Sequence, residues 1–345
     1  MSRGLGAEGF LNNAWYVADW ADAITSALTP LEILGQRVVL FRAADGRPVA
    51  LEDACPHRKL PLSLGRREGD TLVCGYHGLT FDTSGACIAA PTQAAPPKAC
   101  VRAYPLAERY GLVWIWMGDP AAADPSAIVD IPQWGSRDWG YNRGPVMHVD
   151  CHYLYVVDNL LDPTHVTWVH PGSFGDASCA AVPIETTAKP NGVTAARWLT
   201  DTQPAPFYAK FLRFTGRADR YQHYEMRYPS NAVIKAVFVP AGTSGCTEPL
   251  HADAFCMDSF NFLTPVNAQQ TRYFWFQLRN FAPDDEAVSD EFTQDVTHAF
   301  EEDRVILNAV QIGMDTSPTP GIDLKNDLAS FRFRQTLARM IAAEG

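Results

Sequence analysis

The chain has 345 residues, 47% of them hydrophobic, and a formal net charge of −11. It is long enough for one large core or two smaller ones, and its composition is not that of a disordered chain. The negative charge argues against nucleic acids and anionic membranes as partners, because both are bound by clustered positive charge. The net charge does not argue against a small anionic substrate, since binding one needs only one or two local cations.

The compartment is predicted from cysteine usage and from the apolar segments. Eight cysteines at irregular spacing do not form the pattern of a disulfide-rich secreted domain. The first residues lack the basic and then apolar segment of a signal peptide. No run approaches the roughly 18 apolar residues of a membrane span. We therefore expect a cytoplasmic protein with no membrane partner.

The first third of the chain reads as β-structure. Short apolar runs are separated by Gly, Pro and Asp turns, which is typical of strands; they include Val38–Phe41, Thr71–Val73 and Leu112–Met117. A Pro- and Ala-rich stretch, Asp119–Pro132, reads as a linker. We therefore predict an all-β domain over residues 1–125 and a second domain over residues 126–345.

The second domain mixes helix and strand. Tyr153–Leu161 is predicted to be helical, and Asn231–Val239 and Arg272–Phe281 read as strands. Glu291–Gln311 is the clearest helix, because its apolar residues recur at spacings of three and four. A small β unit followed by a mixed unit predicts an α+β fold, with an antiparallel sheet and flanking helices in the second domain.

Two cysteines and two histidines in the first domain form a metal-ligand pattern. Cys55 and His57 stand in one short segment, and Cys74 and His77 in another. Two thiolates and two imidazoles are the ligands of a Rieske [2Fe–2S] cluster, whose imidazoles raise the potential to about −150 to +300 mV. A zinc site is the alternative, but zinc sites usually pair Cys with Cys and His with His. One residue of each kind per segment favours the cluster.

The second domain carries two more histidines beside an acid. His165 and His170 are five residues apart, about 140° around a regular helix, so an unbroken helix would not direct both at one ion. Pro163 and Pro171 indicate a helix break that can bring the two rings together. A mononuclear iron that activates O2 needs two histidines and one carboxylate on one face. The segment therefore predicts two of its three ligands.

The missing carboxylate is expected from the helix 291–311. Asp303 shares the apolar face of that helix with Val296 and Ala299, whereas Glu301 and Glu302 point elsewhere by spacing. A buried carboxylate needs a partner, so Asp303 is either an iron ligand or half of a buried ion pair with an arginine. We prefer the iron ligand.

Asp162 and Asn159 are expected to support this site. The Asp162 carboxylate can accept the ring N–H of His165 and hold its tautomer. The simpler alternative is an N-cap of the helix that follows. Asn159 is assigned to the same network.

These motifs carry a resemblance to a known family. The pattern Cys55-Pro-His57-Arg58 with Cys74-Gly-Tyr-His77-Gly78 resembles the Rieske motif of ring-hydroxylating and demethylating oxygenases. Asn13–Val17 and Tyr110–Trp116 are similar to the vanillate O-demethylase, toluenesulfonate methyl-monooxygenase and dicamba O-demethylase group. The resemblance implies Asp303 as the third iron ligand and a homotrimer. It also implies that Asp162 connects the mononuclear iron to a cluster histidine of the neighbouring subunit.

The resemblance also implies the reaction. The expected substrate is an aromatic acid with a methoxy group, which O2-dependent oxidation demethylates; hydroxylation of an aryl methyl group or of the ring is the alternative. The chain shows neither a dinucleotide-binding fingerprint nor ferredoxin cysteine spacing, so electrons should come from a separate NAD(P)H-dependent reductase of the flavin or ferredoxin type. A Rieske electron carrier and a zinc-stapled binding protein are rival classes, and neither explains His165, His170 and Asp303.

The substrate pocket leaves a weaker pattern. Lys235 lies on the face of Val233 and Val237 in the predicted strand Asn231–Val239 and could hold a carboxylate or sulfonate. A solvated lysine is the alternative. Weaker lining candidates are Asn261, Phe262, Phe274 and Trp275.

Overall fold

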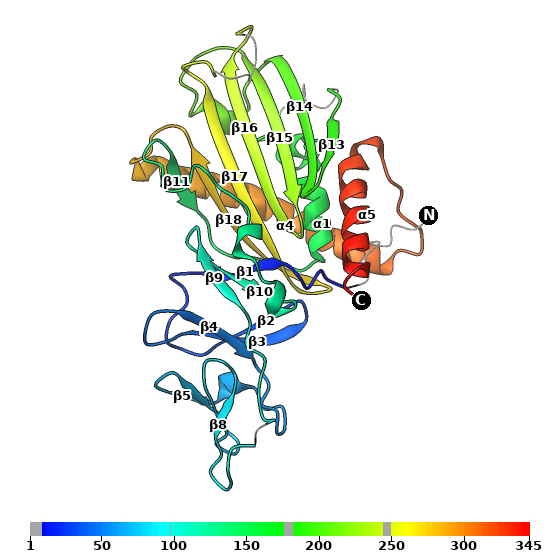
Figure 1. Ribbon diagram of the computed structural model, residues 1–345. Coiled ribbons are helices and arrows are strands. Elements are labelled where there is room, and N and C mark those ends of the chain that lie inside the picture. Colours follow the sequence, from blue (N-terminus) through cyan, green and yellow to red (C-terminus); the bar gives the residue numbers. More distant parts are fainter. Residues whose placement is uncertain (1–8, 97, 176–181, 244–249) are drawn as a thin grey trace.

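The computed structural model describes residues 9–96, 98–175, 182–243 and 250–345. Its N-terminal part consists of small antiparallel sheets, which occupy the lower half of Figure 1. One sheet has the order β1 (Trp15–Trp20), β10 (Leu112–Trp116), β9 (Leu106–Arg109), and a second has β2 (Thr29–Ile33), β3 (Gln36–Arg42), β4 (Pro48–Glu52). The third runs β5 (Arg66–Glu68), β6 (Thr71–Val73), β7 (Thr80–Phe81), β8 (Cys87–Ala89).

The C-terminal part is built on one eight-stranded antiparallel sheet. Most of its strands follow one another in sequence, so each hairpin pairs a strand with its predecessor. The order is β11 (Gly140–Arg143), β18 (Gln270–Arg279), β17 (Phe255–Asn267), β16 (Asn231–Pro240), β15 (Ala218–Arg227), β14 (Gly192–Thr202), β13 (Glu185–Lys189), and β12 (Met147–Val149) also pairs with β18.

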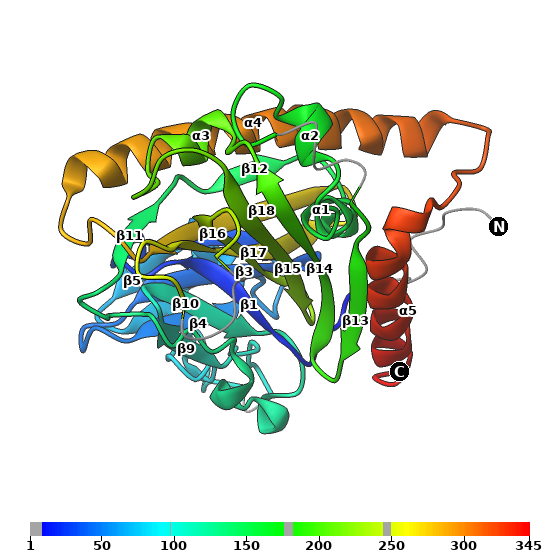
Figure 2. The same cartoon turned by 90° about the horizontal axis from the view of Figure 1, so that it is seen from above.

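Helices cover one face of this sheet. The long helix α4 crosses the face together with shorter segments, and α5 lies beside the β13 edge (Figure 2). Their bounds are α1 (Tyr153–Leu160), α2 (Val166–Val169), α3 (Pro206–Ala209), α4 (Glu286–Thr316) and α5 (Leu328–Ala342). Short 3-10 turns occur at Leu62–Leu64, Pro120–Ala122, Pro125–Ala127 and Lys325–Asp327.

Helix α4 forms where the sequence pattern predicts it. The Asp285 side chain accepts a hydrogen bond from the main-chain nitrogen of Val288 at 3.1 Å and caps the first turn. Buried side chains then recur every three or four residues along the helix, from Phe292 through Val296 and Ala299 to Asp303. Two polar residues, Asp303 and Gln311, are thereby carried onto the buried face of the helix.

Both faces of the large sheet are buried. On the helix side, strand residues such as Tyr224 and Met257 join the main core. On the other side, Phe262 and Phe274 pack with aromatic residues of β1 and β10, including Trp114. The sheet is therefore the middle layer between the helices and the N-terminal part.

The predicted α+β architecture is confirmed, with the helix at 291–311 extended at both ends to Glu286–Thr316. The predicted linker 119–132 is ordered: it holds two short 3-10 turns, capped by Asp119 and Asp124. The boundary between residues 125 and 126 falls in the second turn and stays a prediction. None of the described helices has the length and apolar character needed to cross a bilayer.

Candidate functional site

The Cys/His pairs lie on two matching loops. Cys55 and His57 follow β4, and Cys74 and His77 follow β6. In each loop the main-chain nitrogen of the cysteine donates to the carbonyl of the fifth residue after it. The cysteine carbonyl accepts from the main-chain nitrogen of the fourth residue after it. That fourth residue has positive φ in both loops: Lys59 at 59° and Gly78 at 71°. The two loops therefore make the same turn around their cysteines.

The four side chains fit a cluster between the loops. The Nδ1 atoms of His57 and His77 are 3.1 Å apart. Two nitrogens bound to one ion by bonds of about 2.0–2.1 Å would be roughly 3.3 Å apart at tetrahedral angles. Cys55 and Cys74 are buried and not disulfide-bonded. Burial raises the pKa of the Cys55 thiol, and the adjacent Cys74 thiol raises it further, so thiolates here need a metal cation beside them.

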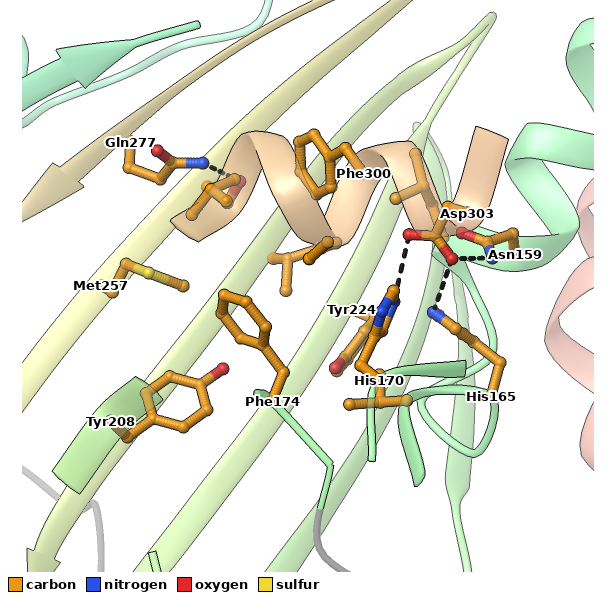
Figure 3. A pocket seen from close by; sticks show the side chains of 16 residues that line it. Asn159, His165, His170, Phe174, Tyr208, Tyr224, Met257, Gln277, Phe300 and Asp303 are labelled. Atoms are coloured by element: carbon orange, nitrogen blue, oxygen red, sulfur yellow. Dashed lines mark hydrogen bonds and ion pairs between the residues drawn. The ribbon is translucent and has the colours of Figure 1, made fainter. Parts of the chain in front are cut away.

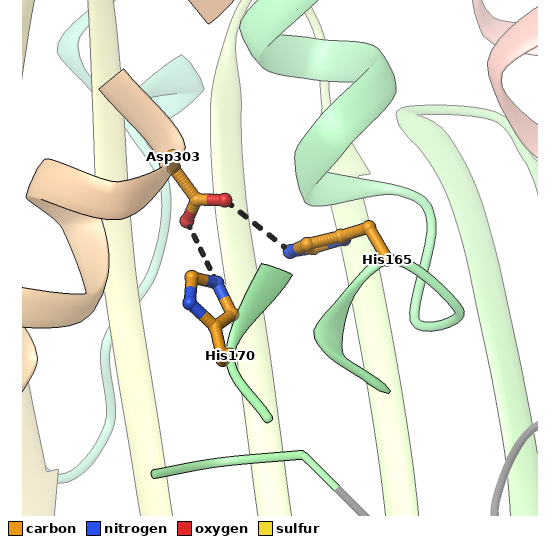
Figure 4. Close-up of side chains that lie close together, drawn as sticks. All are labelled: His165, His170 and Asp303. Atoms are coloured by element: carbon orange, nitrogen blue, oxygen red, sulfur yellow. Dashed lines mark ion pairs between the residues drawn. The ribbon is translucent and has the colours of Figure 1, made fainter. Parts of the chain in front are cut away.

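Three further groups converge beneath α4. The Nε2 atom of His170 lies 3.2 Å from Asp303 Oδ2, and Nε2 of His165 lies 3.6 Å from Asp303 Oδ1 (Figure 4). One ligand atom from each residue lies within 4.8 Å of the other two. Bonds of about 2.0–2.2 Å to one ion at tetrahedral angles place ligand atoms roughly 3.3–3.6 Å apart, close to the two distances between Asp303 and the histidines. Two imidazoles and one carboxylate are the donor set of an O2-activating ferrous site.

The two histidines converge because the helix between them is short. His165 immediately precedes α2, and His170 ends it with φ −118° and ψ 48°. The rings are 5.5 Å apart between centroids and inclined by 76°. Gly175 closes the turn by donating to the His170 carbonyl at 2.8 Å. A Cβ on Gly175 would lie 2.6 Å from the Val166 oxygen, so only glycine fits there.

A hydrogen bond from outside the triad orients each of the three side chains. His170 Nδ1 donates to Glu302 Oε2 at 2.7 Å, and Asn159 Nδ2 donates to Asp303 Oδ1 at 2.9 Å. His165 Nδ1 donates to the main-chain carbonyl of Asp162. With both Nδ1 atoms protonated, both Nε2 lone pairs face the shared centre, which is the tautomer that metal binding requires.

Two expectations about these supports were wrong. The Asp162 carboxylate does not bond the His165 ring; it accepts from the main-chain nitrogen of Thr164 at 2.8 Å and from its hydroxyl. The carboxylate thus caps a turn, and the main-chain oxygen of Asp162 holds the ring instead. Glu302 does not point elsewhere, since it contacts the ring edge of His170 that faces away from Asp303.

The electrostatics favour a cation at this centre. Burial opposes charge on both Asp303 and His170. For Asp303, the hydrogen bond from His170 and the charges of the two histidines outweigh burial, and its pKa is lowered. For His170, the contacts with Asp303 and Glu302 outweigh burial and raise its pKa. The buried carboxylate therefore stays ionised by pairing with positive charge, which a metal ion also supplies.

A cavity opens beside the triad on the helix side of the sheet (Figure 3). Its empty volume, counting the part open to solvent, is about 570 Å³. Apolar and aromatic side chains dominate its wall, among them Phe174, Tyr208, Tyr224, Ile234, Met257, Val296 and Phe300. Polar groups enter from Ser259 and Gln277, which are hydrogen-bonded at 3.2 Å. The wall suits one aromatic ring near the three ligands.

Lys235 is not placed where a substrate anion could reach it, which corrects that expectation. Its neighbour Ile234 lines the cavity, so Lys235 points to the opposite face of β16. Its Nζ donates to Asp258 Oδ2 at 3.0 Å, and Gln133 donates to the same oxygen at 2.9 Å. The lysine is therefore neutralised by a buried carboxylate on the far side of the sheet.

The four weaker lining candidates also lie outside the cavity wall. Phe262 and Phe274 pack on the far face of the sheet. Asn261 and Trp275 are on the cavity face, but Asn261 accepts from the Tyr273 hydroxyl at 2.9 Å and Trp275 packs behind Phe300. Sequence reasoning missed the actual lining residues because most are ordinary core residue types with no distinguishing pattern.

Comparison with known proteins identifies both halves of the chain. Residues 14–105 match the Rieske [2Fe-2S] domain, and residues 149–343 match the vanillate O-demethylase oxygenase C-terminal domain. A Rieske domain joined to a catalytic domain with a two-histidine, one-carboxylate site defines a Rieske non-haem iron oxygenase. The chain belongs to the family of vanillate O-demethylase-type oxygenase components within that class.

Relatives match over nearly the whole chain. The iron–sulfur subunit of the toluene-4-sulfonate monooxygenase system of Comamonas testosteroni is 39% identical, covering 97% of this chain and 98% of that protein. The vanillate O-demethylase oxygenase subunit of Pseudomonas sp. (strain HR199 / DSM 7063) is 33% identical, covering 97% and 96%. Dicamba monooxygenase bound to 3,6-dichlorosalicylic acid superposes with a TM-score of 0.89 at 30% identity, covering 98% and 99%.

These findings identify the cofactors and the class of enzyme. The Rieske domain is of the [2Fe–2S] type, and dicamba monooxygenase has also been solved with a non-haem iron. The protein is thus an oxidoreductase that uses O2, and its relatives are oxygenase parts of systems with more than one component.

Proposed function

We propose that the chain is the terminal oxygenase of a monooxygenase system that O-demethylates a methoxy-substituted aromatic acid. The observation that carries the proposal is the convergence of His165, His170 and Asp303 at one end of an aromatic-lined cavity. In this assignment those three residues hold the ferrous ion, and Cys55, His57, Cys74 and His77 hold the cluster. When bound, the iron activates O2 and the cluster delivers electrons one at a time.

The protein's own part in the reaction is to bind, orient and exclude water. The cavity wall, with Phe174 and Phe300 beside the triad, holds the ring and keeps bulk water from the reacting carbon. The methoxy C–H is replaced by C–OH, giving a hemiacetal that releases formaldehyde and leaves a phenol. One O2, two electrons and two protons are consumed, and one oxygen atom leaves as water.

The electrons come in this proposal from a separate NAD(P)H-dependent reductase of the flavin or ferredoxin type. The cluster loops follow β4 and β6 of the N-terminal part, in the lower half of Figure 1, whereas the triad residues belong to α4 and to the two ends of α2 in the C-terminal part. This separation within one chain supports a homotrimer in which a neighbour's cluster serves each iron. Asp162 is the proposed link because its main chain contacts His165, and Asn159 contacts Asp303 within the same network.

A second candidate is hydroxylation of an aryl methyl group. It is favoured by the 39% identity to a subunit named for toluene-4-sulfonate. The two metal sites and the electron supply would be unchanged; only the carbon that is oxidised differs. A cytoplasmic location agrees with both candidates, because Cys55 and Cys74 must stay reduced to bind iron and NAD(P)H must reach the reductase.

Aerobic turnover with NADH and a Rieske reductase tests the proposal. The substrates are 4-methoxybenzoate, 3-methoxybenzoate and 4-methylbenzenesulfonate, with formaldehyde, phenols and hydroxymethyl products measured. Formaldehyde formed in equal amount to the phenol supports demethylation, and a hydroxymethyl product alone supports the second candidate. An iron-replete protein that yields no O2-dependent product from any of them contradicts both. Asp303→Asn is the control that should abolish every product.

A further inference from the structure

Within the described part of the chain, a buried arginine beside the cavity has no acidic partner. Arg220, on β15, is 3% exposed. Its Nη2 donates to the Tyr208 hydroxyl at 3.2 Å, and its buried Nε has no hydrogen-bond partner. Among residues 9–96, 98–175, 182–243 and 250–345, no carboxylate forms an ion pair with it. The charge is therefore enclosed without being neutralised.

Other buried arginines of the domain are tied to stronger acceptors. Arg272 pairs with Asp19 at 2.8 Å, and Arg334 with Asp158 at 2.7 Å. Arg197 donates to the Gln222 side chain and to main-chain carbonyls. Arg279 leaves its Nε and Nη1 without a partner, but its Nη2 donates to two main-chain carbonyls and the Ser289 hydroxyl. Each of these arginines fastens one segment to another. Arg220 has one neutral hydroxyl instead.

The surroundings of Arg220 would suit an apolar side chain. Its guanidinium carbon lies 4.6 Å from the Tyr208 ring centre and 5.0 Å from that of Phe238. Cation–π contacts offset only part of the cost of burying an unpaired charge. Across the sheet, Arg220 is aligned with Leu199 and Phe238, both apolar. A charge kept at this cost indicates a use for the charge itself.

Arg220 lies behind Tyr208, which lines the cavity, and does not itself belong to the cavity wall. It shares the cavity face of β15 with Tyr224, four residues along. Tyr208 lines the cavity with its hydroxyl turned inward, across from His165 and Asp303 (Figure 3). The guanidinium is thus one hydrogen bond away from the cavity. No Lys or Arg occurs among the described residues of the wall, so Arg220 is placed to provide positive charge beside Tyr208.

We propose that Arg220, with the Tyr208 hydroxyl, binds the carboxylate or sulfonate of the aromatic substrate. This assignment rests on the proposed function and gives Arg220 the role that the sequence pattern gave to Lys235. A ring anchored beside Tyr208 directs the group opposite the anion toward His165, His170 and Asp303. The pocket therefore selects aryl anions whose methoxy or methyl group is para to the acid group over their ortho isomers.

Ligand binding to the anaerobic, metal-replete protein tests the anion site. Equilibrium dialysis compares 4-methoxybenzoate and 4-methylbenzenesulfonate with neutral 4-methylanisole. Arg220→Gln should weaken binding of whichever anion the wild type binds by about 10- to 100-fold, the range for a charged hydrogen bond, and leave 4-methylanisole unchanged. Arg220→Lys should restore part of the affinity, because it keeps the charge but not the planar fork.

Lys235→Met is the matched control, since it removes a cation from the neighbouring strand on the opposite face. It should leave binding of both anions unchanged. Equal weakening of anions and 4-methylanisole in Arg220→Gln, unchanged anion binding, or an equal loss in Lys235→Met would overturn the proposal. Preference for 2-methoxybenzoate over 4-methoxybenzoate in the wild type would overturn the assignment of the two ends.

The variants also separate this inference from the proposed reaction. Anion binding that depends on Arg220, without any oxidised product, leaves the anion site standing and rejects the reaction. If the protein forms product and the KM for the anions is the same in wild type and Arg220→Gln, the reaction stands and the anion site is rejected. If Arg220→Gln lacks cluster absorbance, Tyr208→Phe takes its place as the test. Tyr208→Phe should weaken binding of the anions by about 2- to 10-fold and leave binding of 4-methylanisole unchanged. An equal loss of affinity for 4-methylanisole overturns the proposal.

Discussion

The contact between Glu302 and His170 makes a quantitative prediction about iron binding. Glu302 Oε2 accepts from His170 Nδ1 at 2.7 Å, and the Glu302 side chain is 34% exposed. Loss of such a support typically lowers metal affinity or activity by 10- to 100-fold. Partial exposure screens the carboxylate, so we expect the lower end for Glu302→Ala: about tenfold weaker iron binding, or about 1.4 kcal/mol. Glu302→Gln keeps a hydrogen-bond acceptor without the charge. It should cost about half that energy, which is a roughly threefold loss of iron affinity.

Chelator competition measures this effect, with mononuclear iron quantified while cluster absorbance is monitored separately. Glu301→Ala is the matched control, because Glu301 is the adjacent acid and pairs with Arg304 on the outer side of α4. Cluster absorbance should be the same in all variants. If Glu302→Ala retains iron as tightly as Glu301→Ala, the supporting role assigned to Glu302 is refuted.

Three other predictions concern the cluster, the subunit link and pH. His77→Ala should abolish the visible cluster spectrum, and an intact Rieske spectrum would reject His77 as a ligand. Asp162→Asn should keep both metal centres but slow electron transfer between them; normal single-turnover rates would remove Asp162 from the path. Burial lowers the pKa of His152 from 6.5 to about 4, so the unfolded chain binds a proton between these values that the folded chain does not. His152 should therefore lower the free energy of unfolding by about 2 kcal/mol between pH 7.5 and pH 5. His152→Asn should show a correspondingly smaller drop in Tm, and an unchanged pH dependence would contradict the assignment.

The residues with strict chemical requirements were predictable from the sequence. Asp303 stood out because a carboxylate on an apolar helix stripe needs a partner, and the structure brings it to His165 and His170. Pro163 and Pro171 predicted that the helix breaks on either side of those histidines, and the structure keeps only the short helix α2 between them. Donor chemistry and helix periodicity together were sufficient to predict which side chains meet.

The supports and the cavity were less predictable, for physical reasons. An imidazole has two nitrogens on different edges, so His170 contacts both Asp303 and Glu302, although helix spacing assigns these acids to different faces. Lys235 was correctly placed with Val233 and Val237, but both faces of β16 are apolar and buried. Strand alternation separates the two faces without telling which one carries the cavity.

The same limit explains why Arg220 was overlooked. In the sequence it is one of several arginines among alternating strand residues, and its neighbours along the chain include Asp219. Only the folded sheet turns Arg220 to the cavity side, where no acid of the described residues pairs with it. Asp219 instead accepts from the main-chain nitrogens of Asp201 and Gly242.

Iron speciation in the isotopically enriched protein tests the central claim most directly, namely that one chain carries both a thiolate–imidazole cluster and a separate iron. Mössbauer spectroscopy of the reduced wild-type protein should show the diiron cluster plus about one high-spin ferrous ion per chain. Asp303→Asn should lose the ferrous signal and keep the cluster signal. A wild-type spectrum with the cluster alone, or a ferrous signal of full intensity in Asp303→Asn, would contradict the account.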